Sequence, residues 1–292
     1  MKVNKPSRSA GIIAAHRAIE SLKPQDQRIC YDPYAAMILP PGFTVVGEHD
    51  ISPETALELF KGRVPGFHEH FLARTRYIDE YLQHFIKNNL EQLVILGAGY
   101  DSRPYRFPEL NNTIPIFEVD YPATQEYKIE KLKEVLKTFP SNVNHVSIDF
   151  LEDNLPTVLI EKGYRKNLKT LFIWEGVTMY IDEKAVDKTL SFISSNEGEG
   201  SAVIFDFTYA DVIEGKSEIF EAKEWFKIAS ESDEPLAFGI EKGKIEDFLR
   251  ERGFHNIECI TDEYFKSHYF TGCNEGMKST PILSLVHAVV GE

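Results

Sequence analysis

The sequence predicts an α/β fold built on a mainly parallel sheet. After Glu91 the chain alternates short apolar runs with helical segments, and parallel strands require such crossover connections. One of these runs, Leu93–Leu96, leads directly into Gly97-Ala98-Gly99. The two glycines let the backbone turn sharply and approach a ligand closely. A buried strand followed by such a turn is typical of the first strand in a nucleotide-cofactor fold.

The composition fits a protein with a substantial core. The chain has 292 residues, of which 42% are hydrophobic, and a net charge of -14. This charge argues against nucleic acid or an anionic membrane as a partner. Three scattered cysteines without a CxxC pair argue against a disulfide framework or a zinc site. Since no signal-like or membrane-spanning apolar run is evident, we expect a cytoplasmic protein with no membrane partner. The pattern predicts no particular oligomeric state.

The first ninety residues are predicted to form a helical N-terminal cap. A helix is expected over Ser9–Ser21, before the break at Pro24. A longer helix is expected between Gly66 and Asn89, where apolar residues recur at three- and four-residue intervals. We therefore divide the chain into a cap at 1–90 and a cofactor-binding domain at 91–292.

The second region contains seven predicted strands and one long insert. The insert, residues 208–241, is rich in charge but carries Phe220, Trp225 and Phe226. It is longer than a simple connection, so it is either a lid facing the substrate or structural padding. A helix is expected at Lys244–Phe254, stopped by Gly253. The predicted strands are Leu93–Leu96, Ile114–Asp120, Asn144–Phe150, Thr170–Glu175, Ala202–Phe207, Ile257–Ile260 and Ile282–Val290.

The glycine turn carries a negative charge that narrows the choice of cofactor. A dinucleotide-binding turn favours a third glycine at position 102 and no fixed carboxylate beside the diphosphate. Here Ser102 occupies that position, with Asp101 before it and Arg103 after it. A carboxylate at Asp101 repels a diphosphate but attracts a cation, such as the ammonium or sulfonium region of S-adenosylmethionine. An NAD(P)-dependent oxidoreductase is the disfavoured alternative, and a noncatalytic cofactor-binding protein is another.

Further carboxylates follow the next strands, where ligands of open α/β sheets bind. Asp120 can accept hydrogen bonds from both ribose hydroxyls, and its alternative role is a helix N-cap. Asp149 can accept from an adenine amino group while Phe150 packs on the base, although Phe150 alone is more typical of a core residue. Glu175 is expected either to contact the cofactor or to form a structural salt bridge.

A cation for the methionyl carboxylate is available at Arg74-Thr75-Arg76. The planar guanidinium can bind a carboxylate through two parallel hydrogen bonds. Because Arg74 and Arg76 point to different sides of a helix, only one of them is expected to face the site. Two solvated helix charges are the alternative.

These motifs together resemble the leucine carboxyl methyltransferase family and its bacterial relatives, a branch of the class I S-adenosylmethionine-dependent methyltransferases. The resemblance covers most of the chain. It rests on Arg17-Ala18-Ile19-Glu20, Asp32-Pro33-Tyr34-Ala35, Arg74-Thr75-Arg76-Tyr77-Ile78-Asp79, the Gly97–Arg103 turn, Phe117-Glu118-Val119-Asp120, Asp149-Phe150, Trp174-Glu175-Gly176-Val177-Thr178-Met179-Tyr180 and Phe248–Phe254.

The resemblance implies a Rossmann-like methyltransferase sheet of seven strands with an antiparallel edge. It also implies a set of cofactor contacts. Arg74 would bind the methionyl carboxylate, the Gly97–Gly99 turn would pack on the methionine part, and Asp120 would bind the ribose. Asp149-Phe150 would bind the adenine, and Glu175 would form the wall near the methionyl group.

The expected reaction is S-adenosylmethionine-dependent methyl transfer to an oxygen of a small molecule. The Glu175-Gly176-Val177 sequence is similar to the bacterial small-molecule branch, because the eukaryotic phosphatase-modifying enzymes typically carry cysteine where Gly176 stands. The family favours carboxyl acceptors, which need no base, followed by hydroxyls, which do. No catalytic residue is assigned, and Tyr180 is a candidate base or substrate contact. The histidines of His68-Glu69-His70 diverge on a helix and lack a third ligand, so no metal is expected.

Overall fold

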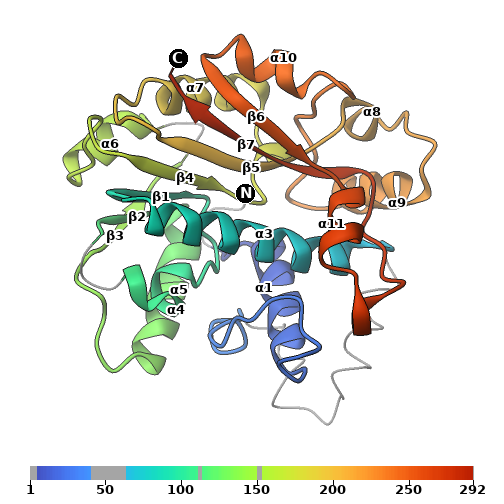
Figure 1. Cartoon of the computed structure of the whole chain (residues 1–292), viewed down its shortest axis with the longest axis horizontal. Coiled ribbons are helices and arrows are strands. Elements are labelled where there is room, and N and C mark those ends of the chain that lie inside the picture. Colours follow the sequence, from blue (N-terminus) through green and yellow to red (C-terminus); the bar gives the residue numbers. More distant parts are fainter. Residues whose placement is uncertain (1–4, 41–63, 111–113, 150–152, 292) are drawn as a thin grey trace.

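The structure is a computed structural model that describes residues 5–40, 64–110, 114–149 and 153–291 (Figure 1). It is a sheet covered by helices on both faces. Within the described ranges, no helix combines the length and the apolar character needed to cross a membrane.

The predicted sheet of seven strands with an antiparallel edge is confirmed. The strands lie in the order β3-β2-β1-β4-β5-β7-β6. The first five are parallel, whereas β7 runs antiparallel to both β5 and β6. The strands are β1 (Gln92–Leu96), β2 (Ile116–Asp120), β3 (Val143–Ser147), β4 (Thr170–Trp174), β5 (Ala202–Thr208), β6 (Phe254–Ile260) and β7 (Leu283–Val290).

The central strands are apolar on both faces because helices cover both. Along β1, Val94 and Leu96 belong to one core cluster, whereas Leu93 and Ile95 belong to the other, as the two-residue period of a strand requires. The first cluster includes residues of α6 (Leu155–Glu161), α7 (Glu183–Ser194) and α10 (Ile245–Arg250), and the second includes residues of α3 (Phe67–Lys87) and α11 (Asp262–His268).

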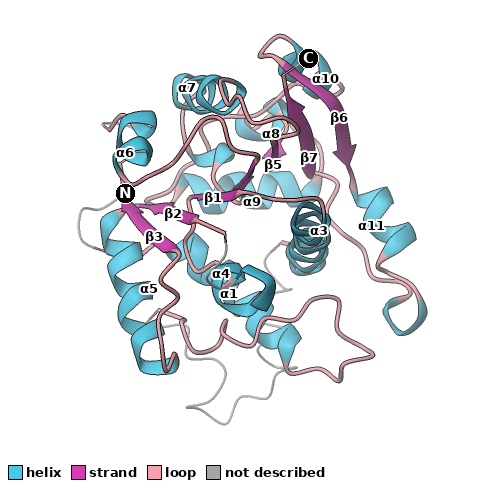
Figure 2. Cartoon of the chain, turned by 60° about the vertical axis from the view of Figure 1, so that its left-hand side comes forward, coloured by secondary structure: helices cyan, strands magenta, loops and turns pink. Residues whose placement is uncertain are grey.

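The two N-terminal helices form close to the predicted positions. Helix α1 spans Arg8–Ser21, and the Ser7 side chain caps it by accepting a hydrogen bond from the Ala10 amide. Helix α3 packs Leu72, Ile78 and Leu82 into the sheet core, and none of the three is exposed. Helices α1, α4 and α5 share a smaller core (Figure 2). The remaining helices are α4 (Arg103–Arg106), α5 (Pro122–Val135), α8 (Ala210–Ile213) and α9 (Phe220–Ser230), with short 3-10 turns at Pro108–Leu110, Thr178–Tyr180 and Gly272–Asn274.

Several predicted boundaries differ from the observed ones. The helix expected at 244–254 ends at Arg250 and is followed by a turn, so β6 begins at Phe254, three residues earlier than predicted. A bulge near Asn256, whose φ is +48°, hid the alternation of this strand. The strand expected at 144–150 ends at Ser147, and Phe150 lies outside the described residues.

The strand order creates the ligand-binding edge. From β1 the chain builds β2 and β3 on one side, then returns to place β4 on the other side of β1. Ligands in such sheets bind beyond the carboxyl ends of the strands at this reversal. Gly97 follows β1 and Glu175 follows β4, so the predicted residues converge at this edge.

Candidate active site

A cavity of about 510 Å³ opens at the carboxyl ends of the strands. Residues from α1, α3, the strand ends and the 208–241 segment line it. The predicted site residues on its wall are Arg74, Gly97, Gly99, Asp101, Asp120, Asp149, Glu175 and Tyr180. Phe150 lies outside the described residues, so its predicted role remains a prediction.

The glycine turn brings two strand ends into direct contact. Gly97 and Gly99 have φ values of +64° and +43°, which favour glycine. A Cβ at Gly97 would overlap the side chain of Val177, which follows β4. The turn after β1 therefore packs against the turn after β4, and the loop backbone is exposed to the cavity between them.

Asp120 is held by backbone amides at the end of β2. Its carboxylate accepts hydrogen bonds from the Gly99 amide and from the Tyr121 amide. Burial raises the pKa of Asp120 to about 6. Tyr121, rather than Asp120, is the N-cap of α5, so the capping alternative does not describe this residue. Each carboxylate oxygen keeps a further lone pair that a ribose hydroxyl can reach from the cavity.

Arg74 is the buried cation of the site, with 1% of its surface exposed. Its Nε donates to Glu175 Oε1 at 3.0 Å, and its Nη1 pairs with Asp206. Its Nη2 lies 2.8 Å from Glu175 Oε1 but, among the described residues, has no partner in hydrogen-bond geometry. Arg76 lies on another face of α3 and pairs with Glu80 at the surface. Of the two arginines, Arg74 therefore faces the cavity.

Asp206 is a site residue that the sequence reasoning did not assign. It lies in β5, is fully buried, and accepts a hydrogen bond from the Gly176 amide at 2.6 Å. Burial raises the pKa of Asp206, and the adjacent Arg74 acts in the opposite direction. The available signal was an acidic residue inside the apolar run Ala202–Phe207. Such a residue is rarely buried without a cationic partner.

Glu175 and Asp101 share a second buried arginine. Arg103 Nη1 lies 2.8 Å from Glu175 Oε2 and 2.5 Å from Asp101 Oδ2, and its Nε lies 2.7 Å from Asp79 Oδ1. Burial alone would raise the pKa of Glu175, but the guanidiniums of Arg74 and Arg103 outweigh it and hold the pKa below its usual range. The structural salt bridge weighed for Glu175 is therefore present, and the residue also lines the cavity.

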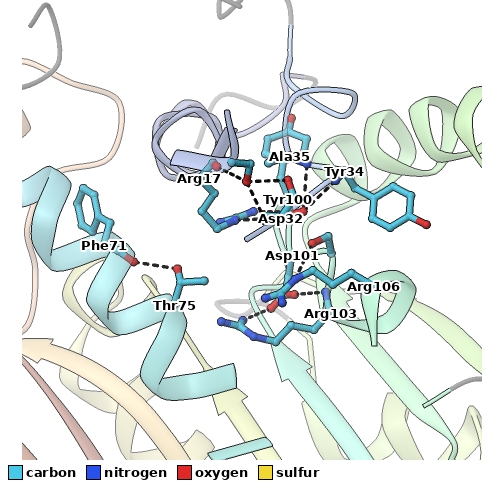
Figure 3. A network of polar contacts seen from close by, with 12 residues as sticks. Arg17, Asp32, Tyr34, Ala35, Phe71, Thr75, Tyr100, Asp101, Arg103 and Arg106 are labelled. Carbon is cyan, nitrogen blue, oxygen red and sulfur yellow. Dashed lines mark hydrogen bonds and ion pairs between the residues drawn. The ribbon is translucent and has the colours of Figure 1, made fainter. Parts of the chain in front are cut away.

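A third arginine connects the N-terminal segment to the glycine turn (Figure 3). Arg17 of α1 places Nε 2.9 Å from Asp32 Oδ2 and donates from Nη2 to the Tyr100 carbonyl at 2.6 Å. Both Arg17 and Asp32 are buried. Their contact positions α1 beside the cavity, where Ala10 lies 3.0 Å from a Cβ built on Gly99. No role was predicted for this pair from the residues alone.

The other end of the cavity is aromatic. We use the term aromatic wall for Phe67, Phe71, Met179, Tyr180 and Trp225, all of which line the cavity and pack together. The Phe67 ring lies 5.4 Å from that of Phe71 and 5.3 Å from that of Trp225, both edge-on. Burial raises the pKa of Tyr180 well above its ordinary value, so its hydroxyl is protonated at neutral pH and can donate a hydrogen bond.

The insert at 208–241 contains the adjacent aromatic residues Trp225 and Phe226, and of these two only Trp225 lines the cavity. Trp225 of α9 is 7% exposed and belongs to the aromatic wall. The adjacent Phe226 is 36% exposed and lies against Gly215 instead. Phe226 does not line the cavity, and the lid role of the insert stays a prediction.

The histidines of α3 point to different neighbours. His68 Nδ1 lies 2.9 Å from His16 Nδ1, whereas His70 Nδ1 lies 3.0 Å from Ser279 Oγ. Among the residues that the structure describes, no group of three or more histidine, cysteine, aspartate or glutamate side chains could hold a metal ion.

The wall fits S-adenosylmethionine in three respects. Arg74 lines the cavity, and its buried Nη2 has no partner in hydrogen-bond geometry among the described residues. The turn at Gly97 and Gly99 presents backbone without side chains to the cavity. Carboxylates at Asp120, Asp149 and Glu175 surround the space between them with negative charge, which suits an ammonium and a sulfonium.

Comparison with known sequences agrees with this geometry. The sequence model of the family described as "Leucine carboxyl methyltransferase" matches residues 10–194. A Bacillus subtilis protein named as an S-adenosyl-L-methionine-dependent methyltransferase, YktD, is 30% identical over 218 residues, covering 75% of this chain and 71% of that protein. A protein of Mycobacterium sp. strain JLS with the same type of name is 28% identical over 264 residues, covering 89% and 86%.

Solved structures show the same fold at low sequence identity. A structure described as a methyltransferase from Thermobifida fusca matches with a TM-score of 0.60 at 12% identity, covering 100% of this chain and 97% of the other. A duf574 family protein from Streptomyces avermitilis matches with a TM-score of 0.59 at 14% identity, covering 93% and 99%.

Proposed function

The chain belongs to the leucine carboxyl methyltransferase family and is an S-adenosylmethionine-dependent methyltransferase, and we propose that it methylates an oxygen of a small-molecule carboxylate or hydroxyl. One observation carries the proposal: a single cavity joins an acidic, arginine-containing end to the aromatic wall. The first end suits the cofactor, and the second suits a mainly apolar acceptor. Family membership removes the NAD(P)-dependent alternative, and the intact wall argues against a protein that only binds the cofactor.

We assign the cofactor contacts within this proposal. Arg74 would hold the methionyl carboxylate through its Nη2, and the glycine turn would pack against the methionine part. Asp120 would accept the ribose hydroxyls, and Asp149 would accept from the adenine amino group. Glu175 would form the wall beside the methionyl group while keeping Arg74 oriented.

When bound, S-adenosylmethionine supplies a methyl group on a cationic leaving group, which makes in-line displacement intrinsically favourable. The protein contributes mainly alignment and exclusion of water. Arg74 and the glycine turn fix the donor end, whereas the aromatic wall confines the acceptor and keeps the space between them apolar. Tyr180 can orient the acceptor oxygen by donating a hydrogen bond to it.

A screen with labelled methyl donor tests the proposal. Small carboxylic acids, phenols and alcohols are offered, with amines and thiols for comparison, and release of S-adenosylhomocysteine is followed together with product mass. We expect methyl esters or methyl ethers, which treatment with base distinguishes. Transfer to nitrogen, carbon or sulfur in preference to oxygen would contradict the proposal, as would binding of NAD without binding of S-adenosylhomocysteine.

A further inference from the structure

We infer that the aromatic wall receives an uncharged aromatic hydroxyl acceptor, of the phenol type, in preference to a carboxylate. The inference rests on the proposed oxygen methylation and decides between its two acceptor classes. It also departs from the carboxyl preference that the family resemblance suggests. Two observations support it: the charge of the cavity wall and the shape of its apolar end.

The cavity wall carries more carboxylates than cations. The described residues that line it include two arginines, Arg17 and Arg74. They also include seven carboxylates: Asp101, Asp120, Asp149, Glu175, Asp206, Asp233 and Glu234. Arg103 lies behind the wall and pairs with two of these. Asp149 and Asp233 each have a further partner, so we count the other five carboxylates. These five outnumber by one the three arginines and the single net positive charge of the cofactor.

The arginines of this wall already have carboxylate partners. Arg74 pairs with Glu175 and Asp206, and its remaining donors are assigned to the cofactor. Arg17 binds Asp32 and the Tyr100 carbonyl. Each arginine on the described wall is therefore already paired with a carboxylate. An anionic acceptor would enter against the field of the wall, with the neutral Tyr180 hydroxyl as the donor that we assign to its oxygen.

Glu234 is a wall carboxylate whose charge acts on Tyr180. Its Oε1 accepts from Ser7 Oγ at 3.0 Å and its Oε2 from the Ser9 amide at 3.3 Å, which fixes the carboxylate beside the start of α1. After burial, the charges of Glu234 and Asp206 make the largest contributions to the raised pKa of Tyr180. Both carboxylates therefore act on the space next to the Tyr180 hydroxyl. An anionic acceptor would experience the same repulsion there.

The apolar end has the shape of a site for a ring. Phe71 precedes Arg74 by one helical turn, and the Arg74 guanidinium lies 5.1 Å from the centre of the Phe71 ring. Phe67 lies one further turn away, so the wall extends roughly 10 Å along α3 from the cofactor end. Trp225 closes the other side with its ring edge-on to Phe67. An aromatic acceptor can pack on these rings with its hydroxyl toward the cofactor.

Methyl transfer to such an acceptor releases one proton, which a group on the cavity wall can accept. Transfer forms the oxygen–methyl bond and breaks the sulfur–methyl bond, whose electron pair stays on sulfur. The hydroxyl proton passes to a carboxylate of the cavity wall, for which we propose Glu234. The Tyr180 hydroxyl, which is protonated, donates a hydrogen bond to the acceptor oxygen.

Calorimetry on the complex with S-adenosylhomocysteine tests the inference, with 2-naphthol and 2-naphthoate as a matched pair at pH 7. We expect 2-naphthol to bind at least about tenfold more tightly, because the carboxylates of the wall repel the charge of 2-naphthoate. Equal or tighter binding of 2-naphthoate, or no binding of 2-naphthol at millimolar concentration, would overturn the inference.

Variants show which residues produce the preference for 2-naphthol over 2-naphthoate. Trp225→Leu should weaken 2-naphthol binding about tenfold while binding of S-adenosylhomocysteine is retained, which also shows that the variant is folded. Phe226→Leu, on the outer side of the same helix, is the matched control and should change neither. Glu234→Gln should narrow the preference for 2-naphthol over 2-naphthoate. If Trp225→Leu leaves 2-naphthol binding unchanged, the acceptor does not lie on the aromatic wall.

The two proposals fail in different ways. If the protein forms methyl esters and prefers 2-naphthoate, oxygen methylation stands and the inference is wrong. If the methyl group reaches nitrogen, carbon or sulfur, the proposed function itself is wrong.

Discussion

Replacing Arg74 by alanine is the sharpest test of the cofactor site. If Arg74 Nη2 binds the methionyl carboxylate, the variant loses a hydrogen bond between charged groups, worth roughly 1.5–3 kcal/mol. The dissociation constant of S-adenosylhomocysteine should therefore rise by about 10- to 150-fold. Isothermal calorimetry measures this change directly.

The same substitution also affects folding, because Arg74 is paired in the absence of ligand. Without Arg74, the fully buried Asp206 loses this cationic partner, and Glu175 keeps its ion pair with Arg103. Breaking a buried ion pair from one side costs roughly 3–5 kcal/mol of unfolding free energy. The urea midpoint should fall accordingly, and calorimetry must be performed where the variant is folded.

A double variant separates the two effects. Arg74→Met with Asp206→Asn removes both charges, and the asparagine can still accept from the Gly176 amide. We expect this protein to recover part of the lost stability but none of the lost affinity. Arg76→Ala is the control, because its exposed pair with Glu80 contributes at most about 1 kcal/mol. Wild-type affinity in Arg74→Ala, or a larger loss in Arg76→Ala, would refute the assignment.

Three further predictions follow from named contacts. Because Asp120 has a pKa of about 6 and must be ionised to accept both ribose hydroxyls, affinity for S-adenosylhomocysteine should fall as pH drops from 7 to 5. Asp120→Asn should remove that dependence and bind more weakly at pH 7, and its urea midpoint should fall, because asparagine has one oxygen for the two backbone amides that the carboxylate accepts. Gly97→Ala should lower both the melting temperature and cofactor affinity, since its methyl group overlaps Val177 and its φ is +64°. Lys128→Met should lower the free energy of unfolding in urea by roughly 3–5 kcal/mol, because the buried Glu118 carboxylate loses its lysine partner. Affinity for S-adenosylhomocysteine should be unchanged where the variant is folded.

Much of the sheet could be predicted from the sequence because its signals are local. The strands β1 and β4 each contain a run of four apolar residues, and β5 is apolar up to Asp206, as strands buried on both faces require. The edge strand β6 was placed too short because its partly exposed residues and its bulge interrupt the apolar pattern. The helix before it was placed too long, since the turn at 251–253 contains good helix formers.

The cavity wall was predictable only where a residue sits beside a strand end. The carboxylates after β2, β3 and β4 follow from the rule that parallel strands present their carboxyl ends to one edge. Trp225 and Phe226 are adjacent in an insert, and their sequence does not indicate which of the two faces inward. The structure decides it through the orientation of α9, which buries Trp225 and exposes Phe226.

The ion pairs of the site could not be predicted from the sequence, for a different reason. Arg74 and Asp206 are separated by 132 positions, and their contact exists only because α3 crosses the sheet near the end of β5. A guanidinium has five donors in a fixed plane, so its partners depend on that crossing and not on nearby sequence. The residue chemistry nonetheless constrains the outcome, because a buried aspartate in an apolar strand requires a cation. In this fold the most buried arginine of the cavity wall supplies it, and one nitrogen of that arginine, Nη2, has no partner in hydrogen-bond geometry among the described residues. The charge that stabilises the end of β5 and the charge proposed to hold the cofactor are therefore one group, which is why stability and affinity must be measured separately in its variants.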